Sequence, residues 1–160
     1  MNYKKYALIK NELSTIFNFV SIGHKGNFRK VVIYSPTTNP NVYNLGFGDL
    51  KYDPTKKRYI IDDQVINDNG DIRVILATVV KTAYEFTSVN PHVTIFFRGS
   101  DTKRTNTYKR AIMLNLKELS ETFDIFGARM IENNKIIDEP FDYKKDYDGF
   151  LIKRKRIWRV

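Results

Sequence analysis

The chain has no cysteine, only two histidines and no long apolar run among its 160 residues. Without cysteine, a thiol nucleophile, a cysteine-based zinc site and a disulfide framework are all excluded, and the composition fits a reducing compartment. No apolar run approaches the roughly 20 residues that span a bilayer, and no N-terminal segment resembles a signal peptide. We therefore expect a soluble cytoplasmic protein that does not enter a membrane.

The few residues suited to acid–base or metal chemistry form no motif. His24 and His92 lie in a predicted turn and at the start of a predicted strand, and a histidine without a partner motif is rarely a catalyst. The acids between Asp62 and Asp71 resemble a calcium loop but lack its alternating oxygen ligands and its closing Glu. A helix start explains them better, with Asn69 or Asp71 as the cap. We expect no metal, no cofactor and no catalytic residue.

Positive charge is what the chain does have, with 27 Lys and Arg against 18 Asp and Glu and a formal net charge of +9. The C-terminal sequence KRKRIWRV, residues 153–160, combines basic side chains with one tryptophan and contains no acid. Such a surface favours a polyanionic partner, namely nucleic acid. A basic C-terminal strand or tail is explained equally well as a soluble sheet edge, where lysine and arginine prevent aggregation.

Hydrophobic periodicity predicts a mixed fold in a single domain, residues 1–160. Alternation of apolar residues indicates strands, and spacings of three and four indicate helices. In chain order we predict strands at 16–22, 28–34 and 42–50, a helix at 71–87, a strand at 93–97, a helix at 102–123, and strands at 124–131 and 149–160. We expect an α+β domain with a largely antiparallel sheet of about six strands, two helices packed on one face, and the order β-β-β-α-β-α-β-β.

The most informative stretch is 92–113, where an apolar strand breaks at Gly99 and a basic helix follows. Ser100, Asp101 and Thr102 are all suitable helix caps, and the amides at such a helix start favour an anion. Lys103, Arg110 and Lys117 recur every seven residues and should form one basic face. The candidate anion- or nucleic-acid-binding residues are Ser100, Thr102, Lys103, Arg104, Tyr108, Lys109, Arg110, Lys153, Arg154, Lys155, Arg156 and Trp158.

Two of these candidates are aromatic, and their rings are suited to stacking on bases. Tyr108 is able to stack on a base, but it also begins the apolar stripe of its helix, so core packing is favoured. Trp158 adds a stacking surface to the basic C-terminus. The leading hypothesis is a non-enzymatic module that binds RNA or single-stranded DNA through a basic surface.

Two alternatives remain open. The order of strands and helices is similar to that of ribonuclease H-like nucleases, with Asp101 after a central strand and Asp49 or Asp63 as partners around a metal. The first strand, however, has no carboxylate, so a metal-dependent enzyme acting on a phosphorylated substrate is the weaker reading. The third hypothesis is an interaction component with a protein partner or a second copy of itself.

Several motifs occur together and in order: VYNLGFGDL, RGS followed by RTNTYKR, and DYDGFLIKRK. Together they resemble a family of small bacterial proteins known only as a domain of unknown function. The resemblance spans roughly residues 16–155 and implies a compact α+β domain. It carries over no activity and no catalytic residue.

Overall fold

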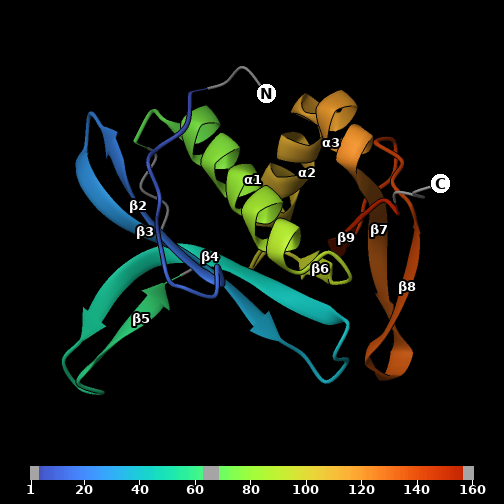
Figure 1. Ribbon diagram of the computed structural model, residues 1–160, viewed down its shortest axis with the longest axis horizontal. Coiled ribbons are helices and arrows are strands. Elements are labelled where there is room, and N and C mark those ends of the chain that lie inside the picture. Colours follow the sequence, from blue (N-terminus) through green and yellow to red (C-terminus); the bar gives the residue numbers. More distant parts are fainter. Residues whose placement is uncertain (1–3, 63–68, 157–160) are drawn as a thin grey trace. The chain divides into compact units, whose positions relative to one another are not determined.

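The computed structural model describes residues 4–62 and 69–156 (Figure 1). The strands are β1 (Ile9–Lys10), β2 (Ile16–Gly23), β3 (Gly26–Pro36), β4 (Val42–Asp53), β5 (Arg58–Asp62), β6 (Thr94–Phe97), β7 (Phe123–Ile131), β8 (Lys135–Pro140) and β9 (Gly149–Arg154). The helices are α1 (Ile72–Val89), α2 (Thr102–Leu114), α3 (Leu116–Thr122) and the short 3-10 turn η1 (Glu132–Asn134). No helix within these described residues is long and apolar enough to cross a membrane.

The mixed fold and the largely antiparallel sheet are confirmed, but the predicted number and order of strands are wrong. Among the described residues the sheet has nine strands, hydrogen-bonded in the order β1-β2-β3-β4-β6-β9-β7-β8, with β5 pairing β4. Strands β4 and β6 pair in parallel. The strands missing from the prediction are β1, β5 and β8, which are short or mostly exposed and therefore give little apolar alternation.

The second predicted helix, at 102–123, is divided into α2 and α3 at Asn115. The side-chain amide of Asn115 donates to the carbonyl of Ala111 at 2.8 Å, and its backbone N–H bonds to Ile112 rather than continuing the helical ladder. Asparagine competes with the backbone in this way and interrupts helices. The described residues therefore contain three α-helices, where two were predicted.

The chain forms two compact units. Unit 1 comprises Met1–Ser35 and Leu45–Val89, and unit 2 comprises Pro36–Asn44 and Asn90–Val160. Strand β4 contributes residues to both. The strands β1, β2 and β5, β3 up to Ser35, and the helix α1 belong to unit 1, whereas β6 to β9, α2 and α3 belong to unit 2.

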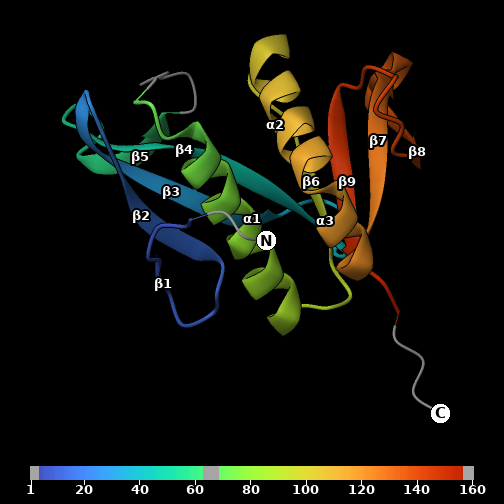
Figure 2. The ribbon, with the colours of Figure 1, turned by 90° about the horizontal axis from the view of Figure 1, so that it is seen from above.

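In unit 1, α1 covers one face of the strands (Figure 2). The rings of Tyr34 on β3 and Phe86 on α1 are stacked with centroids 4.2 Å apart, and the Tyr34 hydroxyl lies 2.8 Å from that of Thr82. The apolar stripe predicted for this helix is thus buried against the sheet, as its periodicity indicated.

The polar residues before α1 do not cap it with their side chains. The Asp71 carboxylate accepts hydrogen bonds from Tyr6 and Ser21, while the Asn69 amide donates to Ser21 and to the carbonyl of Gly26. The side-chain cap predicted for these residues is wrong, because both side chains bind the N-terminal segment and the β2–β3 turn instead. The backbone carbonyl of Asp71 accepts from Ile75 and begins the helix.

In unit 2, β9 lies between β6 and β7, with β8 beyond β7. The predicted basic final strand ends at Arg154 and is an interior strand, so its cations do not protect a sheet edge. Phe97 on β6 and Phe150 on β9 are opposite each other, with ring centroids 5.6 Å apart, and Tyr108 of α2 contacts Phe97 edge-on. These rings form the core that holds α2 on unit 2.

Candidate functional site

The strand-to-helix junction predicted at Gly99 is present in unit 2, between β6 and α2. Asp101 is the helix cap: its carboxylate accepts from the backbone N–H of Arg104 at 2.8 Å and from the Arg104 guanidinium at 2.5 Å. Gly99 is required by close approach, since an added Cβ would lie 2.3 Å from the backbone nitrogen of Thr105. The capping prediction is confirmed for Asp101.

The amides of this junction are largely satisfied within the chain. The N–H of Gly99 donates to the Thr105 hydroxyl at 3.1 Å, and the N–H of Thr105 donates to the carbonyl of Asp101 at 3.0 Å. The Asp101 carboxylate also places negative charge at the start of α2, where an anion would otherwise be favoured. The amides of Gly99, Arg104 and Thr105 therefore do not form an open phosphate cradle, and an anion here must be bound mainly by side chains.

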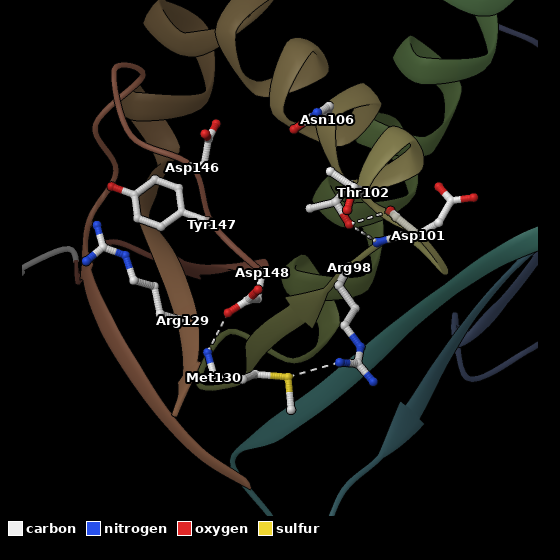
Figure 3. A pocket seen from close by; sticks show the side chains of 11 residues that line it. Arg98, Asp101, Thr102, Asn106, Arg129, Met130, Asp146, Tyr147 and Asp148 are labelled. Carbon is white, nitrogen blue, oxygen red and sulfur yellow. Dashed lines mark hydrogen bonds between the residues drawn. The ribbon is translucent and has the colours of Figure 1, made fainter. Parts of the chain in front are cut away.

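A cavity of about 600 Å³ lies beside the junction (Figure 3). It is lined by the segment that follows β6, the first turns of α2, Arg129 and Met130 of β7, and the loop residues 146–148. Three cations at or near this pocket have carboxylate partners: Arg104 with Asp101, Lys109 with Asp146, and Arg129 with Glu139.

Arg98 differs from these three cations. Its guanidinium donates to the sulfur of Met130 at 2.9 Å (Figure 3), and a thioether is a weak acceptor. No carboxylate in the described part of the chain forms an ion pair with Arg98. Because Asp148 also contributes a carboxylate, which accepts from the N–H of Met130 at 2.7 Å, the pocket lining as a whole is close to charge-balanced.

A second positive feature is the stretch that spans α2 and the start of α3. Residues 102–117 contain five cations and no acid, as TKRTNTYKRAIMLNLK shows. Lys103, Arg110 and Lys117 are exposed, and the first two share a face of α2, separated by about 10 Å along its axis. Lys117 lies in α3, beyond the break. We call Lys103, Arg110 and Lys117 the cation row.

The other helix candidates lie as follows. Ser100 and Thr102 are exposed at the junction. Tyr108 is half-buried, and its ring contacts Phe97 with centroids 5.6 Å apart. Lys109 donates to the carbonyl of Lys145 at 2.7 Å and lies 3.5 Å from Asp146. Tyr108 thus packs in the core of unit 2, as its place in the apolar stripe indicated.

The C-terminal candidates are not brought next to the junction. The start of β9 is near it, because Phe150 pairs with Phe97, but Arg154 pairs with Phe123 at the other end, about 14 Å further along the strand. There the Arg154 guanidinium lies 5.6 Å from the Phe123 ring. Lys153 is half-buried, Lys155 and Arg156 are exposed, and Trp158 lies outside the described residues.

Sequence reasoning missed several residues of the pocket. Arg98 had a local signal, a charged residue at the end of an otherwise apolar strand. Arg129, Asp146 and Asp148 had none, because only the pairing of β7 with β9 brings their segments beside α2.

Two of the acids proposed for a metal site have other partners in the structure. Asp101 caps α2, and Asp49 forms a buried ion pair with Lys30 in unit 1. Asp63 lies outside the described residues. Within residues 4–62 and 69–156, no group of three or more His, Asp or Glu is arranged to hold a metal ion.

A family model described as a family of unknown function (DUF6934) matches residues 2–155. No curated protein and no solved structure matches the chain.

Proposed function

The chain belongs to this family of unknown function, and we propose from its own surface that it is a non-enzymatic module that binds RNA or single-stranded DNA. The observation that carries the proposal is the cation row, Lys103, Arg110 and Lys117, exposed within a stretch that contains no acid. Lysine and arginine that meet phosphates release counterions, and this release supplies most of the affinity for nucleic acid.

The spacing of the cations favours a polymer over a single small anion. Lys103 and Arg110 are about 10 Å apart on α2 and do not converge on one point. Two such cations contact different phosphates of one strand, and contacts of this kind position the ligand without reading its sequence. Arg98, which has no carboxylate partner among the described residues, adds a further cation at the start of the same helix.

The exposed cations Lys155 and Arg156 extend the same argument. They follow β9, and the N–H of Lys155 donates to the carbonyl of Thr122 at 2.9 Å, which places them beside the end of α3. Only an elongated ligand contacts both this position and the start of α2. This is a second reason to favour a nucleic-acid strand.

The test is the affinity of a mixed-sequence oligonucleotide, measured by fluorescence anisotropy at low salt. Changing all three residues of the cation row to alanine should weaken binding on the order of tenfold or more. The matched control changes three exposed lysines outside the row, Lys10, Lys135 and Lys144, and should have little effect. Absence of binding by the wild-type protein, or an equal loss in both variants, would show that the proposal is wrong.

A further inference from the structure

Two tyrosines of unit 1 lie opposite each other on the β4–β5 pair, and both are more than half exposed. Tyr52 pairs with Tyr59, their ring centroids are 5.4 Å apart, and their exposed fractions are 55% and 58%. Tyrosine is intermediate in burial among side-chain types, and a tyrosine ring still presents a large apolar surface when it is exposed. Two tyrosine rings exposed at one point suggest a binding surface for a flat ligand.

These tyrosines lie on the face of the strands opposite α1. Asp49 and Tyr52 point to opposite faces of β4, because side chains alternate along a strand. Asp49 pairs with Lys30, and Lys30 shares its face of β3 with Tyr34, whose ring stacks on α1. The tyrosine face is therefore the face that α1 leaves uncovered. The β4–β5 pair that carries it is drawn in turquoise and green at the lower left of Figure 1.

The surroundings of the tyrosines are positively charged. Arg29 of β3 reaches the same face, with its guanidinium 5.8 Å from the Tyr59 ring. By strand alternation, no described residue of β2, β3, β5 or the unit 1 part of β4 places an acid on this face. The turn between β4 and β5 adds two exposed lysines, Lys56 and Lys57, whereas alternation places Lys51 and Arg58 on the other face, where Lys51 lies 3.6 Å from Asp62.

We infer that Tyr52 and Tyr59 stack on bases of a single-stranded nucleic acid while Arg29 and the turn lysines Lys56 and Lys57 contact its phosphates. Aromatic rings next to cations on an open sheet are a common solution for binding single strands, because every base offers a flat face. A duplex does not fit, since its bases are already stacked within the helix. The inference rests on the proposed function and adds to it a base-binding site in unit 1.

The test compares two oligonucleotides of equal length, an oligothymidine and the same strand made abasic, which keeps the phosphates but lacks bases. The wild-type protein should bind oligothymidine more tightly. Changing Tyr52 and Tyr59 together to alanine should weaken oligothymidine binding by about tenfold or more and leave the abasic strand unaffected. Changing both to phenylalanine keeps the rings and should keep the affinity.

Controls separate this inference from the proposed function. Tyr143, which is 54% exposed in unit 2, should tolerate alanine without loss of binding. Ultraviolet cross-linking to the oligonucleotide should label the peptides that contain Tyr52 or Tyr59. If the tyrosine variants bind normally while the cation-row variant does not, the base-binding site is wrong and the proposed function stands. If no oligonucleotide binds, both are wrong.

Discussion

Lys30 and Asp49 form an ion pair inside unit 1, with side chains only 6% and 4% exposed. The pair joins β3 to β4 on the face that α1 covers. Removing two charges from water costs several kcal/mol each, and their mutual attraction offsets this cost only while both are present. The pair therefore stabilises the fold only while both partners are present, because either charge alone would be buried without a counter-charge.

Replacement of one partner should be far more damaging than replacement of both. Lys30→Met leaves a buried carboxylate without its partner and should lower the free energy of unfolding by about 3–5 kcal/mol. The double variant Lys30→Met with Asp49→Leu should recover much of that loss, as measured by urea denaturation. Strictly additive losses would contradict this account.

Tyr6 should make stability fall at high pH. Burial, and then its hydrogen bond to the Asp71 carboxylate at 2.5 Å, raise the pKa of the Tyr6 hydroxyl above its ordinary value of 10.0. Because the folded state holds this proton more tightly than the unfolded state, the contribution is complete below pH 10 and is lost as pH rises through the higher folded-state pKa.

The check is urea denaturation of the wild-type protein and of Tyr6→Phe on both sides of pH 10. Lysines titrate in the same range, so only the difference between the two proteins reports on Tyr6. The wild-type protein should lose more stability than the variant as pH rises. Parallel losses would show that the Tyr6 hydroxyl does not contribute.

Gly99 should tolerate no side chain. An added Cβ would lie 2.3 Å from the nitrogen of Thr105 and 2.4 Å from the Cβ of Arg104, so α2 would have to move. Gly99→Ala should lower the free energy of unfolding by about 1–3 kcal/mol. Gly46→Ala is the matched control, since its nearest neighbour is the Ile33 carbonyl at 3.7 Å, and thermal unfolding should show a change below about 1 kcal/mol.

Elements with strong periodicity could be predicted from the sequence. The helix predicted at 71–87 is observed as Ile72–Val89, because its apolar stripe is long and regular. Strand β5 could not be recognised from the sequence, because RYIID is short and lies in a polar region. Its pairing with β4 forms only in the folded chain. The division of the second helix occurs at one residue, Asn115, whose side chain and backbone both bond to the preceding turn.

Only part of the candidate site could likewise be predicted from the sequence. The cap at Asp101 and the exposed, regularly spaced cations follow from local sequence. The pairing of Tyr52 with Tyr59 could not be predicted from local sequence, because it depends on the register between β4 and β5. The separation of the C-terminal cations from the start of α2 likewise depends on the pairing of β9 with β6 and β7.

The salt dependence of binding tests the central claim most directly. For a single-stranded oligonucleotide, the logarithm of the association constant should fall linearly with the logarithm of salt concentration, by about 0.7 for each phosphate contact. Loss of the cation row, Lys103, Arg110 and Lys117, should therefore reduce the slope by about 2. A slope unchanged in this variant, or no binding by the wild-type protein at low salt, would contradict the account.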